Sequence, residues 1–166
     1  MNLTSILSKI GLSQKVSQDI MLISFIALAS FIYGMLIGRY RMMTVLINIY
    51  VAFALLSVVP VNFITDFSTK VVAFFAVLTG LTVLNRRFFD ISLSNTGSGF
   101  LFRVFSMSFL QMTLILSIIL SFLPEKVALE YVSKTAYSYL VTGWAPLIWM
   151  AAPLAYMFFI YKKINR

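Results

Sequence analysis

The sequence predicts an all-α, polytopic membrane protein with four to five transmembrane helices. The mean hydropathy is +0.97. Charged residues make up only 11% of the chain, whereas soluble globular domains carry roughly 25%. Long apolar segments alternate with short polar connectors along the whole chain. We therefore expect the 166 residues to form a single membrane domain.

The first apolar segment, residues 20–38, is free of charge and ends in Gly38-Arg39-Tyr40-Arg41. Its length is about what a helix needs to cross a hydrocarbon core of ~30 Å. Small residues recur on one helical face, which predicts close packing of this helix against another. They are Ala27, Ser30, Gly34 and Gly38.

The predicted spans cover residues 20–38, 42–64, 68–85, 100–123 and 136–161. The strictly apolar part of the third, residues 71–84, is short for a span, so a re-entrant segment is the alternative there. The fourth should stop at Pro124. The fifth is interrupted by Gly143, Pro146 and Pro153, which predicts a kinked helix.

The sequence predicts a short amphipathic helix over residues 1–12. Leu3, Ile6, Leu7 and Ile10 repeat at helical spacing. The stripe is too short to span, so we expect it to lie in the membrane interface. A signal peptide would carry its positive charge before the apolar region and end in a small-x-small site, and neither feature is present. Residues 12–19 are expected to form a polar bridge to the first span.

The third span repeats the small-residue pattern of the first at an offset of 46 residues. Ala73, Ala76 and Gly80 correspond to Ala27, Ser30 and Gly34. We expect both strips to face protein. Such strips support either self-association or packing within one chain, and we favour packing within the chain.

Polar residues at membrane depth form a second group of candidates. They are Asn48, Ser106, Gln111, Thr113, Ser117 and Ser121, most of them on the fourth span. One interpretation is a polar path across the membrane. The other is packing, because Ser and Thr can bond to backbone carbonyls within a helix. The two amides, Asn48 and Gln111, are a sparse lining for a pore.

The net charge of +8 comes from cations scattered between apolar runs, a distribution that argues against nucleic-acid binding. Anionic lipid headgroups are the expected partner. The candidate basic rim comprises Arg39, Arg41, Arg86, Arg87 and Arg103. With five alternating spans, the side of this rim carries the larger number of cations. The positive-inside rule then predicts an outside N-terminus and a cytoplasmic C-terminus.

The composition argues against an enzyme. The chain has neither cysteine nor histidine, which removes thiolate nucleophiles, imidazole bases and the commonest metal ligands. All five acidic residues lie at span ends or in connectors. We therefore predict no catalytic residue, no metal site and no cofactor.

The segment Gly34-Met35-Leu36-Ile37-Gly38-Arg39-Tyr40-Arg41, followed at once by a second span, resembles the start of the colicin V production protein family of small bacterial inner-membrane proteins. The resemblance covers residues 20–64. That family carries a second Arg/Gly-rich element before its last span, where this chain has only Gly99 and Arg103, and the fifth segment is additional. The resemblance implies a non-enzymatic inner-membrane protein linked to peptide export and envelope maintenance.

The most economical prediction is therefore a scaffold or assembly subunit of an envelope or secretion-related membrane complex. Its partners would be other membrane subunits or further copies of the chain. The alternative is a small homo-oligomeric channel or transporter, with the polar face of the fourth span lining the path.

Overall fold

The computed structural model describes residues 14–37, 41–60, 64, 66–85 and 100–164. In this part of the chain the regular secondary structure is entirely helical, which confirms the predicted all-α class. The helices are α2 (Gln14–Ile37), α3 (Met42–Val58), α4 (Phe67–Asn85), α5 (Phe100–Phe122), α6 (Glu125–Tyr131), α7 (Lys134–Val141) and α8 (Ala145–Ile164). The interfacial helix predicted over residues 1–12 lies outside the described residues.

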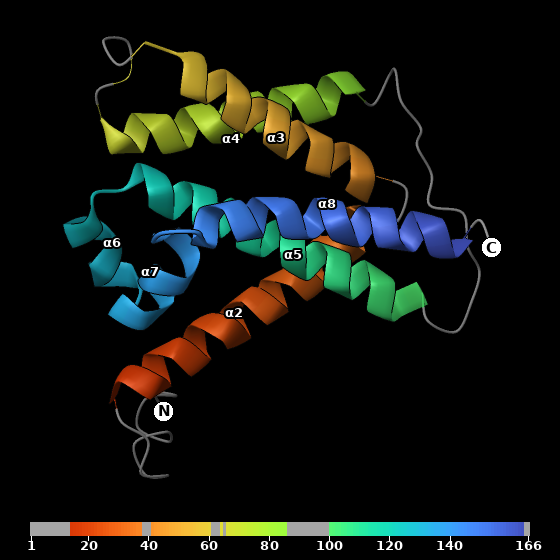
Figure 1. The fold of residues 1–166 in the computed structure, drawn as a ribbon. Coiled ribbons are helices and arrows are strands. Elements are labelled where there is room, and N and C mark those ends of the chain that lie inside the picture. The colour runs from red at the N-terminus through yellow and green to blue at the C-terminus, as the bar shows by residue number, and fades with distance from the viewer. Residues whose placement is uncertain (1–13, 38–40, 61–63, 65, 86–99, 165–166) are drawn as a thin grey trace.

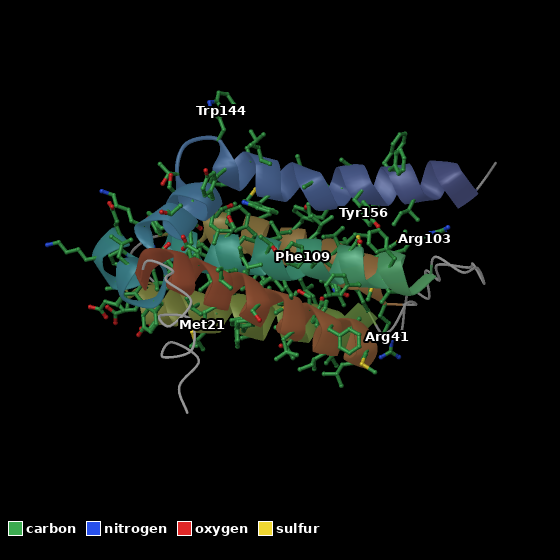
Figure 2. All side chains as sticks on the ribbon, turned by 90° about the horizontal axis from the view of Figure 1, so that it is seen from below. Met21, Arg41, Arg103, Phe109, Trp144 and Tyr156 are labelled. Atoms are coloured by element: carbon green, nitrogen blue, oxygen red, sulfur yellow. The ribbon has the colours of Figure 1, made fainter. Side chains whose placement is uncertain are left out.

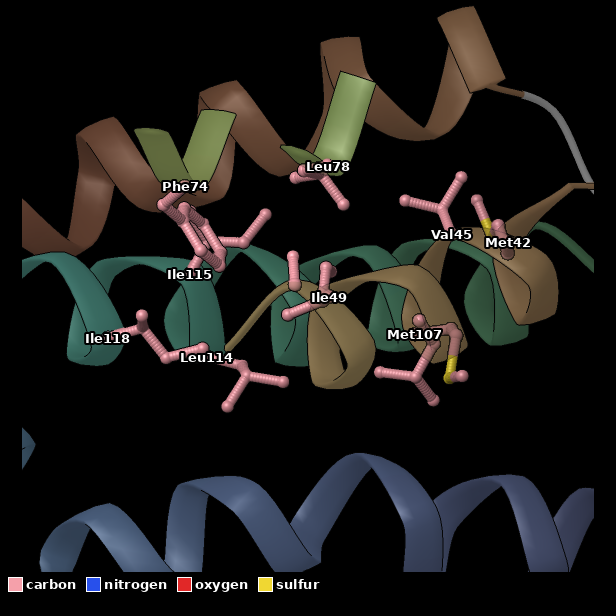
Figure 3. Packing of buried hydrophobic residues seen from close by; sticks show 11 residues of the cluster. Met42, Val45, Ile49, Phe74, Leu78, Met107, Leu114, Ile115 and Ile118 are labelled. Carbon is pink, nitrogen blue, oxygen red and sulfur yellow. The ribbon is translucent and has the colours of Figure 1, made fainter. Parts of the chain in front are cut away.

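Helix α5 is the centre of the bundle (Figure 1). It packs against α2, α7 and α8, and more lightly against α3 and α4, which form a pair of their own. Helices α2, α3, α4, α5 and α8 alternate in direction, while α6 and α7 lie together at one end. Figure 3 shows the main apolar core, in which Met107, Leu114 and Ile118 of α5 meet side chains of α3 and α4.

Two helix ends differ from the predicted boundaries. Helix α2 begins at Gln14, so most of the stretch expected as a polar bridge is helical. Helix α3 ends at Val58 rather than near residue 64. Val59 is extended, with φ −64° and ψ 126°, because the ring of Pro60 disfavours the α conformation in the residue before it.

The fifth apolar segment is divided into α7 and α8, whose axes differ by 61°. The break lies at Gly143, which has a φ of +61°, a value that L side chains adopt only at a cost. Pro146 lies in the first turn of α8, where its missing N–H costs no helical hydrogen bond. Pro153 lies inside α8. The predicted interruption is therefore a glycine break, and neither proline divides the helix.

Among the residues that the structure describes, three helices are long and apolar enough to cross a membrane, namely α2 from Asp19, α4, and α5 from Phe102. The bent pair of α7 and α8 makes a fourth if it counts as one span. Helix α3 is apolar but has only 17 residues. Many large apolar side chains cover the outer surface, including Phe25, Phe31 and Leu36 of α2.

Candidate functional site

The small-residue strip of α2 packs against α5 of the same chain. Gly34 is buried, and a Cβ built on it would lie 2.7 Å from the Ser108 Oγ and 3.4 Å from a methyl group of Val104. Ser30 is fully buried and donates to the carbonyl of Ile26 at 2.5 Å. Ala27 is half-buried, and Gly38 lies outside the described residues. The absence of a side chain at Gly34 is what lets α2 approach α5 this closely.

The corresponding strip of α4 does not pack in the same way. Ala73 is half-buried, but Ala76 and Gly80 are exposed. A Cβ on Gly80 would meet nothing within 4 Å. The expectation that this strip faces protein is therefore not met within the single chain. Helix α4 packs on α3 through another face, which carries the buried Phe74 and Leu78.

A buried hydrogen-bond chain joins α2, α5 and the start of α3. The Tyr33 hydroxyl donates to Gln111 Oε1 at 2.9 Å, and Gln111 Nε2 donates to the Met42 carbonyl at 2.7 Å. Gln111 is 0% exposed, so both ends of its amide have a partner where water has no access. Sequence reasoning found Gln111 but missed Tyr33. The available signal was the single tyrosine within the charge-free span 20–38.

A second buried amide holds α3 and α4 together. Asn48 Nδ2 donates to the Thr82 hydroxyl at 3.2 Å, and Thr82 donates onward to the Leu78 carbonyl at 2.7 Å. Asn85 Nδ2 donates to Asn48 Oδ1 at 2.5 Å. Thr82 and Asn85 were not among the predicted polar residues. Asn48 therefore faces protein, while the buried Thr44 Oγ1, one turn earlier, has no partner among the described residues.

Three of the predicted hydroxyl groups of α5 bond to backbone carbonyls. Ser117 donates to the Leu140 carbonyl of α7 at 2.6 Å, whereas Thr113 and Ser121 donate to carbonyls of their own helix. Ser121 is exposed and Ser106 is half-buried. The predicted polar residues thus form separate groups: Gln111 bonds toward α2 and α3, and Ser117 bonds toward α7.

Charged side chains of the described residues lie at the two ends of the bundle. Figure 2 shows Arg41 and Arg103 at one end, Arg41 on the side of α2 and Arg103 toward α8. At the other end lie both acidic residues (Asp19, Asp66, Glu125 and Glu130) and lysines (Lys70, Lys126 and Lys134), as the bounds of α2, α4, α6 and α7 place them. There, the Ser133 hydroxyl donates to the Asp19 carboxylate. Arg39, Arg86 and Arg87 of the predicted rim lie outside the described residues.

An apolar cleft of about 580 Å³ separates α2 from α4, with α3 and α5 beneath it. It exists because α2 packs on α5 while α4 packs on α3. Its exposed lining includes Phe25, Phe75 and Val83, which are 69%, 42% and 57% exposed and therefore mark its outward opening. A second cavity of about 400 Å³ lies between α2, α5, α7 and α8, with Asp19 at its edge.

The described residues thus combine interhelical hydrogen bonds, an apolar outer surface and an open cleft. Among them, no group of three or more acidic side chains is arranged to hold a metal ion. No family model, curated protein or solved structure matches the chain.

Proposed function

We propose that the protein is a non-catalytic integral membrane protein that acts as a scaffold or assembly subunit of an envelope or secretion-related complex. The observation that carries the proposal is how the polar and apolar groups are distributed. Buried amides such as Gln111 and Asn48 bond to neighbouring helices, while large apolar side chains cover the outer surface. This distribution suits helices that pack with one another inside lipid.

The outer surface supports a location in the membrane. Phe31, Met35 and Leu36 of α2 are 54%, 72% and 80% exposed. Soluble monomers rarely expose contiguous apolar patches larger than a few hundred Å². Lipid or apolar protein is therefore the natural environment for this surface. The charged residues at the two ends of the bundle would then meet the two headgroup regions.

The proposed orientation puts the end with Arg41 and Arg103 in the cytoplasm. Cations of short connectors are retained on the cytoplasmic side of bacterial inner membranes. The same rule places the N-terminus outside. The resemblance to the colicin V production proteins supports the inner membrane as the location, and also the link to secretion and envelope maintenance.

The α4 strip is the surface we propose for assembly. Ala76 and Gly80 are four residues apart and exposed, and small residues at this spacing let two helix backbones approach closely. Gly34 is a poor candidate, because Ser108 and Val104 already occupy the space in front of it. A partner helix would therefore meet α4 and leave the α2–α5 contact intact.

The test is the size of the complex that survives purification in mild detergent. Gly80→Leu should convert a larger complex to a smaller one without loss of membrane insertion, because its side chain blocks close approach of a partner, while a Cβ at this position meets nothing within 4 Å in its own chain. The matched control is Ser24→Leu, a small-to-large change at an exposed position of α2. The proposal fails if Gly80→Leu leaves the complex unchanged, or if the native protein purifies with no partner and no second copy.

A further inference from the structure

We propose that the cleft between α2 and α4 binds one acyl chain of an anionic phospholipid whose phosphate lies beside Arg41. This inference rests on the proposed membrane location but not on the assembly role, since a single chain carries the whole site. It assigns a ligand class to a cavity that the interhelical packing leaves open.

The shape of the cleft fits an acyl chain. Its volume, about 580 Å³, is within the ~300–1,000 Å³ of small-ligand sites. Along α2 its lining extends from Phe25 to Ile37. Twelve residues of helix correspond to about 18 Å at ~1.5 Å per residue. One leaflet of a bilayer contributes about half of the ~30 Å hydrocarbon core, so the cleft is about as long as the chain it would hold.

The chemistry of the lining changes along this length. Phe25, Phe75 and Ile119 line the part of the cleft that is farther from Arg41, and their side chains offer only hydrocarbon. Thr79 of α4 brings a hydroxyl group to the part nearer Arg41, whereas the hydroxyl of Thr82 is bonded to Asn48 and to the Leu78 carbonyl. The order is therefore apolar wall, then the Thr79 hydroxyl, then the Arg41 cation. A phospholipid has the same order, from acyl tail through ester groups to phosphate.

Arg41 supplies the positive charge where the cleft reaches the basic end. Val45, a lining residue, donates its N–H to the Arg41 carbonyl at 2.9 Å, which places Arg41 one helical turn beyond it. The Arg41 side chain is exposed and makes no capping bond to α3. Helix α3 begins beside it at Met42, so unpaired N–H groups and a guanidinium lie together. The acidic residues of the described chain lie at the opposite end, where the bounds of α2, α4 and α6 place them.

A helix from another protein is the competing occupant. The cleft favours lipid because its basic end lacks a described acidic partner and because its opening lies between two helices that would both face acyl chains. Binding of a partner helix in the cleft would not depend on an anionic headgroup beside Arg41. The two occupants therefore differ in whether headgroup charge matters, and the experiment uses this difference.

The test is short-range fluorescence quenching by brominated lipids in the full-length protein reconstituted in bilayers. The chain has no cysteine, so Val83→Cys places a single bimane label at the rim of the cleft. Leu84→Cys is the matched control, because the neighbouring residue is 60% exposed but does not line the cleft. Brominated phosphatidylglycerol is compared with brominated phosphatidylcholine of the same chains.

At residue 83, we expect the anionic lipid to reach half-maximal quenching at about a fivefold lower mole fraction than the zwitterionic lipid. This factor corresponds to the attraction of about 1 kcal/mol between one basic residue and an anionic membrane surface. At residue 84 the two lipids should quench alike. Arg41→Gln should abolish the preference, whereas Arg103→Gln, at the same end but toward α8, should retain it. Thr79→Phe should weaken quenching at residue 83 by narrowing the cleft.

Equal quenching by both lipids at residue 83 would overturn the proposal. Strong quenching at residue 84 with none at residue 83 would also overturn it, since protein would then close the cleft. Absence of quenching at both positions would also overturn the lipid site, since water or a partner helix would then cover α4. Quenching at residue 84 alone would keep the membrane location and refute only the lipid site.

Discussion

The contact between Gly34 and Ser108 yields the sharpest test of the packing. Gly34→Ala adds one methyl group to α2 at a point where a Cβ would lie 2.7 Å from the Ser108 Oγ. Gly80→Ala makes the same chemical change on α4, where a Cβ would meet nothing within 4 Å. Comparing the two substitutions in single chains, where no partner covers Gly80, separates the packing cost from the conformational effect of replacing a helical glycine.

The expected magnitudes follow from these two environments. Alanine is favoured over glycine in a helix by ~1 kcal/mol, and this gain applies at both positions. An extra methyl group in a well-packed interior costs about 1–3 kcal/mol, and this cost applies only at Gly34. Gly80→Ala should therefore raise the free energy of unfolding slightly. Gly34→Ala should leave it unchanged or lower it by up to about 2 kcal/mol.

The measurement is unfolding in mixed micelles of increasing SDS content, followed by helical circular dichroism. Ser108→Gly removes the opposing side chain, so the double variant with Gly34→Ala should recover part of the loss. We expect a coupling free energy in the range of about 0.5–3 kcal/mol found for residues in contact. Equal stability of the Gly34→Ala and Gly80→Ala proteins, together with no coupling to Ser108, would falsify the α2–α5 packing described above.

Three further predictions concern two buried polar residues, Gln111 and Ser117, and the helix break at Gly143. Gln111→Leu should lower stability by about 1 kcal/mol in the SDS titration, because it leaves the Tyr33 hydroxyl and the Met42 carbonyl without partners; unchanged stability would contradict the network. The Ser117→Cys protein should react with a water-soluble maleimide far more slowly than the Thr142→Cys protein. Ser117 is 3% exposed, while Thr142 lies in an exposed connector. Similar reaction rates would mean that water reaches the polar face of α5. Gly143→Ala should cost about 1–2 kcal/mol of unfolding free energy, because its φ of +61° is unfavourable for a residue with a side chain; full tolerance would mean that the break between α7 and α8 lies elsewhere.

Sequence reasoning predicted the helices better than their contacts. The all-α class and the helical character of the 71–84 segment follow from long apolar runs, which leave a chain few alternatives. The packing of Gly34 within its own chain was also predicted from its place on a small-residue face. Gly80 belongs to the same pattern but is exposed, because which face of a helix is covered depends on its neighbours, and α4 turns Phe74 and Leu78 inward instead.

Hydrogen-bond partners were the least predictable feature. Asn48 was expected to face protein, but its pairing with Thr82 and Asn85 depends on the register between α3 and α4. The break in the fifth segment shows the same limit. Three residues capable of interrupting a helix were present, and only the backbone path distinguishes Gly143 from Pro146 and Pro153.

The unequal lengths of α2 and α3 have a consequence for the surrounding bilayer. The apolar part of α2, from Asp19 to Ile37, has 19 residues and α3 has 17, or about 28 Å and about 25 Å at ~1.5 Å per residue. A bilayer around the protein would meet a taller hydrophobic wall on one flank than on the other. Mismatch of this kind is relieved by tilting the longer helix or by thinning the lipid next to the shorter one. The protein would then impose a local gradient of membrane thickness on its neighbours.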